Sequence, residues 1–132
     1  MPRIVRLFAL SILLASLSPA SAETAFEAKA ICRAALAAIT GRDLKLFQAM
    51  DAPDGTIALT YARAFDNFVW SSHCRIEGNR VIWADEPGRW RQDARDEKVT
   101  FEATGSQLRI TRTPVSGAVI QEVYERDKFL ER

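Results

Sequence analysis

The sequence contains a single histidine, His73, and only two cysteines, Cys32 and Cys74, among its 132 residues. Zinc and copper sites generally need three or four ligands, mostly from these residue types, so no metal site is expected. A Ser-His-Asp triad would have to be built around His73, and no G-x-S-x-G motif surrounds Ser71 or Ser72. The shortage of both residue types argues against a zinc or copper site and against a Ser-His-Asp triad, and no cofactor is expected.

An excess of charge of one sign is also lacking. The chain has 18 lysines and arginines against 17 acidic residues. This balance provides no basic footprint for nucleic acid and no polybasic segment for anionic lipid. One apolar run, residues 7–17, is prominent, and it is shorter than the roughly 20 residues that a membrane-spanning helix needs. We therefore expect no nucleic-acid partner and no membrane insertion of the mature protein.

That apolar run belongs to a secretory signal pattern. It follows a positive stretch that contains Arg3 and Arg6, and it precedes small residues that end at Ala22. This order is typical of a signal peptide, residues 1–22, that is cleaved before Glu23. Cleavage would leave residues 23–132 as one domain with a net charge of −1, located in the periplasm or secreted.

The two cysteines indicate one disulfide. An even number of cysteines in an exported domain is most simply read as a pair, Cys32 with Cys74. The bond would close a loop of some 42 residues, for which chain entropy predicts about 4 kcal/mol of stabilisation. The domain is therefore expected to be stapled by this bond.

The first element of the mature chain is predicted to be a helix. Thr24 and Glu27 have the spacing of a capping box, and the alanine-rich run to Thr40 has apolar residues at helical intervals. Gly41 provides the C-terminal stop. Cys32 lies on the apolar face of this helix.

After residue 43 the periodicity becomes two, which predicts strands. A hairpin is expected over residues 44–63, a long strand over 67–77 turning at Gly78-Asn79 into 80–84, a hairpin over 98–111, and a last strand over 118–125. The fold class is α+β: one N-terminal helix packed on a curved antiparallel β-meander of six or seven strands, with closure into a small barrel left open. The charged tail from Arg126 to Arg132 is expected to fray.

Alternation along the strand over 67–77 separates His73 from Cys74, because successive side chains point to opposite faces. The two cannot act as nucleophile and base, and Cys74 is expected to face the core. The residues predicted to share that core face are Phe68, Trp70, Cys74 and Ile76, and those predicted to share the other face are Val69, Ser71, His73 and Arg75.

A polar segment between Trp83 and Val99 has two interpretations. Its acids Asp93, Asp96 and Glu97 could serve glycoside hydrolysis, which uses a pair of carboxylates. They alternate with arginines, and the simpler interpretation is a loop of salt bridges.

Tryptophan and arginine are concentrated between residues 80 and 91. Both are enriched at protein interfaces, so this stretch is the candidate interaction surface. Its members are Arg80, Trp83, Arg89, Trp90 and Arg91. Strand alternation would place Arg89 and Arg91 on one side with Trp90 opposite. The alternative is that Trp70, Trp83 and Trp90 fill a small core under the helix.

Five segments resemble a group of small exported bacterial proteins of unassigned function. They are Cys32-Arg-Ala-Ala, Gly41-Arg-Asp43, Cys74-Arg-Ile-Glu-Gly-Asn-Arg-Val-Ile-Trp83, Gly88-Arg-Trp-Arg91 and Asp96-Glu-Lys-Val-Thr100. The resemblance implies one domain with paired cysteines, and it brings no activity or catalytic residue.

These observations favour a non-catalytic periplasmic binding or interaction domain, with an envelope or extracellular protein as its partner. One alternative is an enzyme inhibitor resembling periplasmic lysozyme inhibitors, which combine export, a disulfide and antiparallel strands. The other is a small hydrolase that uses His73 or the Asp93, Asp96 and Glu97 cluster.

Overall fold

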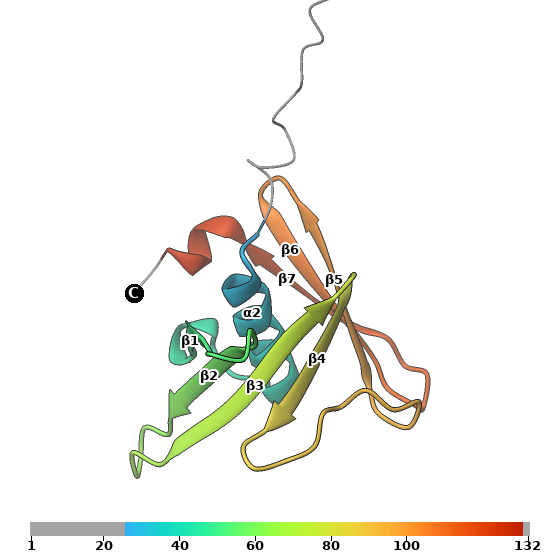
Figure 1. The fold of residues 1–132 in the computed structure, drawn as a ribbon. Coiled ribbons are helices and arrows are strands. Elements are labelled where there is room, and N and C mark those ends of the chain that lie inside the picture. The colour runs from blue at the N-terminus through green and yellow to red at the C-terminus, as the bar shows by residue number, and fades with distance from the viewer. Residues whose placement is uncertain (1–25, 131–132) are drawn as a thin grey trace, which may run out of the picture.

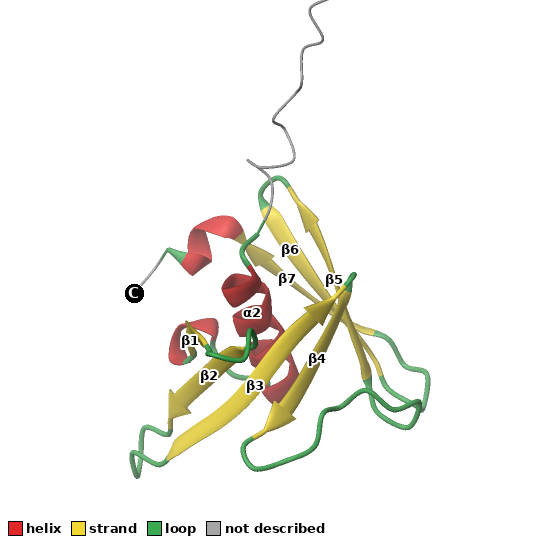
Figure 2. Cartoon of the chain, in the orientation of Figure 1, coloured by secondary structure: helices red, strands yellow, loops and turns green. Residues whose placement is uncertain are grey.

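Residues 26–130, the part of the chain that the computed structural model describes, fold as a curled sheet around one α-helix. Within these residues, α2 (Ala28–Thr40) is followed by seven strands in which each pairs antiparallel with the next. The strands are β1 (Gln48–Asp51), β2 (Ile57–Ala62), β3 (Val69–Glu77), β4 (Arg80–Asp85), β5 (Lys98–Thr104), β6 (Gln107–Thr113) and β7 (Ile120–Glu125). The sheet forms a half-barrel with α2 in its hollow (Figures 1 and 2), which confirms the α+β meander.

Helix α2 starts later than the sequence suggested. Glu27 is the N-cap residue and its side chain makes no capping hydrogen bond, so the predicted capping box is wrong in giving Glu27 the third helical position. Thr24 and the predicted signal peptide, residues 1–22, lie outside the described residues. At the other end Gly41 adopts a left-handed conformation with φ of 67° and its N–H donates to the Ala37 carbonyl, as expected for a glycine stop.

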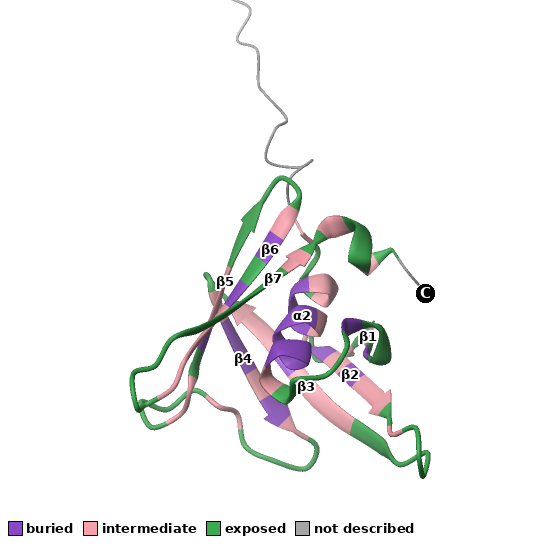
Figure 3. Cartoon of the chain, turned by 180° about the vertical axis from the view of Figure 1, so that it is seen from behind, coloured by how far each residue is buried: buried purple, intermediate pink, exposed green. Residues whose placement is uncertain are grey.

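The core lies between α2 and the inner face of the sheet. Seven helix residues from Ile31 to Ala38 are buried, and four of them are alanines, which allow close backbone approach. The sheet contributes the buried side chains of β2 to β6 (Figure 3). Cys32 of α2 and Cys74 of β3 form the predicted disulfide and are both fully buried. The helix is thus joined covalently to the middle of the sheet.

Two arginine side chains also connect α2 to the rest of the fold by hydrogen bonds. Arg33 donates to the carbonyls of Phe47 and Leu44 at 3.0 and 3.2 Å, which ties the helix to the 3₁₀ turn Leu44–Leu46 ahead of β1. Arg112 of β6 donates to the Ala38 carbonyl at 3.2 Å. This last bond satisfies a carbonyl near the helix C-terminus that has no partner within the helix.

The C-terminal segment departs from the expected fraying. After β7, Arg126–Phe129 form a 3₁₀ turn. Phe129 packs edge-to-face on Phe26 at 5.5 Å and on Tyr124 at 6.4 Å between ring centroids, so the aromatic ring docks this turn on the core. Residues 131–132 lie outside the described part of the chain.

Candidate interaction surface

The predicted surface of arginine and tryptophan belongs to β4 and to the loop that follows it. Val81 and Trp83 contact the helix-side core, and strand alternation therefore turns Arg80 and Ile82 to the outer face of the sheet. The loop from residue 86 to residue 97 is irregular, so the expected strand-like alternation of Arg89, Trp90 and Arg91 does not apply there.

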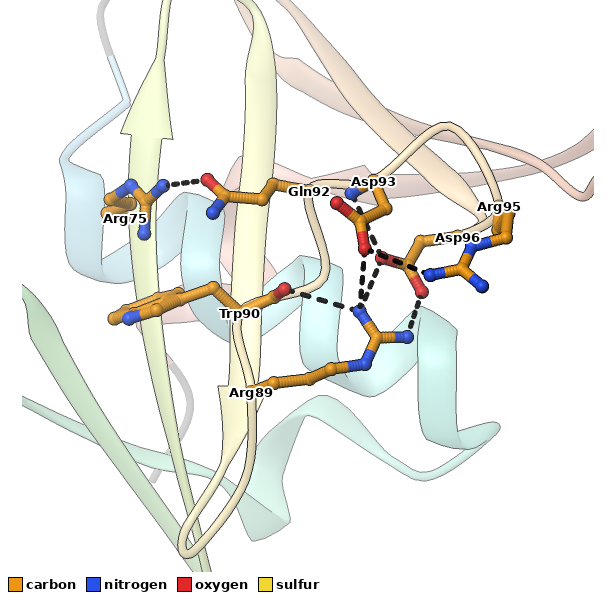
Figure 4. Close-up of polar contacts among 7 residues, drawn as sticks. All are labelled: Arg75, Arg89, Trp90, Gln92, Asp93, Arg95 and Asp96. Carbon is orange, nitrogen blue, oxygen red and sulfur yellow. Dashed lines mark hydrogen bonds and ion pairs between the residues drawn. The ribbon is translucent and has the colours of Figure 1, made fainter.

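This loop folds across the outer face of the sheet. Trp90 lies under the guanidinium of Arg75, 4.4 Å from ring centroid to Cζ, and Gln92 accepts a hydrogen bond of 2.6 Å from the same guanidinium (Figure 4). Ile82, the cross-strand partner of Arg75, is only 1% exposed although it points outward. The loop thus gives this face a small apolar cover.

Arg89 and Asp96 hold the loop closed. Arg89 makes two hydrogen bonds to the Asp96 carboxylate, at 2.8 and 2.6 Å, and the Asp93 N–H donates to it at 3.0 Å (Figure 4). The bonds from Arg89 are the main cause that lowers the pKa of Asp96 to about 2. The Asp96 side chain is 7% exposed and the Arg89 side chain 54%, so the carboxylate is the enclosed member of the ion pair that closes the loop.

Replacing Asp96 with asparagine should remove a pH-dependent part of the stability. A carboxyl whose pKa is lower in the folded chain stabilises the fold above its unfolded pKa, near 3.8, and that contribution disappears as pH falls toward about 2. Melting temperatures of the parent and of Asp96→Asn should therefore differ at neutral pH and converge between about pH 4 and pH 2. A constant difference across this range would contradict the role of the ion pair.

Arg91 lies on the other side of β4. Its guanidinium is 5.2 Å from the Trp83 ring centroid and 3.9 Å from the Asp85 carboxylate. Its backbone N–H donates to the Trp83 carbonyl at 2.8 Å. The structure therefore places Trp83 and Arg91 together on the helix side, Arg80 and Trp90 on the outer side, and Arg89 in the loop closure. As one interaction surface, these five residues stay a prediction.

The hydrolase candidates are occupied by other contacts. Asp93 and Asp96 both lie against Arg89, while Glu97 pairs with Arg112 at 2.9 Å. This is the arrangement of a loop of salt bridges, in which each acid faces an arginine and not a second carboxylate.

His73 does not meet Cys74. Its Nε2 atom contacts the Glu86 carboxylate on the outer face, whereas Cys74 is buried against the helix. In the described residues, no group of three or more histidine, cysteine or acidic side chains is placed to hold a metal ion. No helix there is long and apolar enough to span a membrane.

The structure exposes a different apolar cluster, at the connection between β2 and β3. Phe65 is 82% exposed, Phe68 52%, Val69 55% and Trp70 41%. The predicted core position of Phe68 and Trp70 is therefore wrong, although Cys74 and Ile76 of the same set do face the core. We call Arg63, Phe65, Phe68, Val69 and Trp70 the aromatic tip, and it projects from the lower left of the molecule in Figure 1.

One guanidinium organises the aromatic tip. Arg63 lies over the rings of Phe65, Phe68 and Trp70, at 4.9, 5.0 and 5.8 Å from Cζ to the centroids. It also makes two hydrogen bonds to Asp66, at 3.2 and 2.6 Å, which lower the pKa of that carboxyl. Each contact between the cation and a ring is attractive, so the three rings share one anchor.

The backbone of this connection is also fixed. Arg63 and Phe68 are bridged by a backbone hydrogen bond of 2.9 Å, and the Phe68 N–H donates to the Asp66 carboxylate at 3.0 Å. Asn67 takes a left-handed conformation with φ of 56°, which asparagine tolerates better than most residues. The rings are thus presented by a tight, hydrogen-bonded turn.

A line of stacked groups connects the aromatic tip to the core. Trp70 stacks on Tyr61 with an interplanar angle of 13°, and Tyr61 contacts the buried Phe47 at 4.9 Å between centroids. Arg42, just after α2, lies 5.3 Å from the Tyr61 ring centroid. Aromatic packing therefore connects the tip to the buried core.

A sequence signal for this cluster existed. The segment Arg63-Ala-Phe-Asp-Asn-Phe-Val-Trp70 places three aromatic residues around an Asp-Asn pair, which favours a turn. Apolar side chains in a turn between two strands have no core to pack against within that hairpin. Aromatic residues in such a turn therefore indicate an exposed aromatic cluster.

Comparison with protein-family models, with curated proteins and with solved structures finds no match for this chain. The resemblance to small exported bacterial proteins thus stays a prediction. The geometry of the aromatic tip remains as the basis for a functional proposal.

Proposed function

We propose that the protein is an exported, non-catalytic binding domain that contacts a protein partner of the cell envelope or the extracellular space through its aromatic tip. The observation that carries this proposal is the clustering of three exposed rings around the single guanidinium of Arg63. Scattered exposed apolar side chains are ordinary, whereas a clustered apolar patch marks an interaction site.

The chemistry of the aromatic tip suits a protein partner. Tryptophan, tyrosine and arginine are enriched among the strong contacts at protein interfaces, and phenylalanine is enriched in interface cores as well. Trp70 and Arg63 lie side by side, and Phe65 and Phe68 extend the apolar area around them. An interface here would bury rings at its centre with Asp66 and Asn67 at its rim.

Preorganisation supports the same proposal. Ordering a flexible side chain at an interface costs about 0.5–1.5 kcal/mol. Arg63 is already held by Asp66 and by three rings, and Trp70 is held by Tyr61. Binding would therefore order few additional groups.

Two observations support export of the protein. The signal pattern over residues 1–22 predicts passage through the inner membrane, and the Cys32–Cys74 bond is of the kind that persists in oxidising compartments. An enzyme inhibitor is a special form of this proposal, in which the projecting tip enters a cleft of the target.

Replacing Phe65 and Phe68 with serine should abolish partner capture. Loss of two central rings is expected to cost at least about 2 kcal/mol of binding free energy, which raises the dissociation constant about thirtyfold. The measurement is a crosslinking pull-down from an envelope fraction with the oxidised protein, followed by titration of the captured partner.

The matched control replaces Val115 and Val119 with serine. These side chains are 72% and 56% exposed on the β6–β7 connection, so the control removes a similar apolar pair from another place. Capture retained by this control and lost by the Phe65/Phe68 variant supports the proposal. Equal capture by both variants, or no partner for the parent protein, contradicts it.

A further inference from the structure

β7 forms one edge of the half-barrel and has no strand on its outer side within the described residues. A groove of about 500 Å³ separates this edge from the C-terminal end of α2, so the helix does not cover it. The groove is bordered by Glu122, Val123, Tyr124 and Glu125 on the strand side and by Ala37, Ala38 and Leu44 among the residues of the helix side. β7 therefore has room for another strand.

The hydrogen-bonding direction of β7 follows from one bond at its end. The Arg126 N–H donates to the Ser106 carbonyl at 2.7 Å, so this pair is of the hydrogen-bonded kind. Hydrogen-bonded and non-hydrogen-bonded pairs alternate along antiparallel strands, which makes Leu108–Tyr124 a bonded pair. The backbone groups of Gln121, Val123 and Glu125 consequently point away from β6, toward the open edge.

β7 lacks most of the features that protect edge strands. Residues 120–125 contain no lysine and no proline, and no bulge interrupts the register with β6. Ile120 and Val123 are 41% and 48% exposed. β1 at the other edge has four residues against six in β7, which makes β7 the better template for pairing.

We propose that β7 pairs antiparallel with β7 of a second copy of this chain, about a two-fold axis at Val123, to form one continuous sheet through both copies. In this register Gln121 faces Glu125 of the other copy, and Glu122 faces Tyr124. Each carboxylate of the strand then meets a hydrogen-bond donor. The pairing uses a surface separate from the aromatic tip and does not depend on it.

Both polar pairs have support within one copy. Gln107 already donates to Glu125 across β6 and β7 at 2.8 Å, which shows the same amide–carboxylate pair in a sheet. Burial raises the pKa of Tyr124 to about 12, so its hydroxyl stays protonated and can donate. Glu122 is on the inner face of the edge strand, and an inward-pointing charge without a partner opposes the addition of another strand. In this register, Tyr124 of the second copy is that partner.

Two other two-fold registers set like charges opposite each other. An axis at Glu122 or at Glu125 would set that glutamate against its own copy, and like charges directly opposite each other destabilise a strand pair. The groove is lined by three cations, Arg42, Lys45 and Lys128, and by three carboxylates, Asp43, Glu122 and Glu125, so the register depends on the pairs between the two strands. Charge complementarity thus favours the axis at Val123 over the axes at Glu122 and Glu125.

The first test is sedimentation velocity of the oxidised protein from low micromolar to submillimolar concentration. A monomer–dimer equilibrium is expected, and Val123→Lys should abolish the dimer because it sets two ammonium groups against each other at the axis. Met50→Lys is the matched control, since Met50 is 65% exposed on the opposite edge strand β1. Each variant should retain the melting temperature of the monomer.

The second test locates the axis with engineered cysteines. Directly paired, hydrogen-bonded residues lie about 5.5 Å apart between Cα atoms, within the range of a disulfide. Val123→Cys should therefore crosslink two chains on oxidation, whereas Gln121→Cys should not, because two copies of Gln121 lie four residues apart across the axis. A non-reducing gel separates the two results.

A dimer that is lost in Val123→Lys, kept in Met50→Lys and crosslinked only by Val123→Cys supports the proposal. A protein that is monomeric throughout, or a dimer that Val123→Lys leaves intact, overturns it. Equal loss in both lysine variants overturns it too, because that result indicates β1–β7 pairing. Crosslinking of Gln121→Cys at the level of Val123→Cys overturns the register.

Discussion

Replacing both Cys32 and Cys74 with alanine is expected to lower the free energy of unfolding by about 4 kcal/mol. The bond joins residues 42 positions apart in the chain, so its loss gives the unfolded chain many more conformations. Stabilities of small domains are only about 5–15 kcal/mol, which makes this a large part of the total. The same bond fixes the helix to the central region of the sheet.

Urea titration of the oxidised parent and of the double variant measures this difference. A reducing agent should lower the stability of the parent toward that of the double variant and should leave the variant unchanged. A loss below about 1 kcal/mol would contradict this expectation. It would show that the unfolded chain without the bond already keeps the helix segment close to the strand segments.

Leu36→Ala should cost about 3 kcal/mol of stability. Leu36 is 1% exposed at the centre of α2, where it packs against the inner face of the sheet. Truncation of a buried leucine loses the transfer free energy of the removed atoms and leaves a cavity, with typical costs of 2–5 kcal/mol. The surrounding alanines are too small to fill the space.

Leu130→Ala is the matched control, because Leu130 is 80% exposed. Its effect should stay within about 0.5 kcal/mol. Chemical denaturation with an unchanged slope would assign the loss in Leu36→Ala to the folded core. Similar costs for the two leucines would contradict the burial of α2 in the half-barrel.

Local patterns predicted the strands well, because each hairpin depends on residues close in sequence. Period-two alternation and the Gly78-Asn79 turn correctly predicted the β3–β4 hairpin, and alternation alone placed Cys74 toward Cys32. The position of the helix start was missed, since the spacing of Thr24 and Glu27 also occurs where no capping box forms.

The same alternation failed for Trp70 for a geometric reason. A helix of 13 residues is roughly 20 Å long, whereas a strand of nine residues reaches roughly 30 Å. The end of β3 that carries Trp70 therefore extends past the helix that buries Cys74. Periodicity shows which face a side chain occupies, but not how far along the strand the cover reaches.

The loop after β4 escaped prediction for another reason. Its course is set by the pairs Arg89–Asp96 and Arg75–Trp90, of which the second joins a loop to a strand. Alternating charges in the sequence indicated salt bridges but not their partners. The candidate surface of Arg80, Trp83, Arg89, Trp90 and Arg91 was inferred from composition, and composition does not distinguish the two faces of a strand.

The Cys32–Cys74 bond also determines what a single proteolytic cut can do to this protein. The aromatic tip lies inside the covalent ring that the bond closes, together with β1 and β2. A protease that cleaves the exposed turn at residues 64–67 opens the ring but releases no fragment, because the two pieces remain linked through sulfur. Among the described residues, the tip carries the most exposed aromatic side chains, and a chain cut at that position remains one covalent molecule.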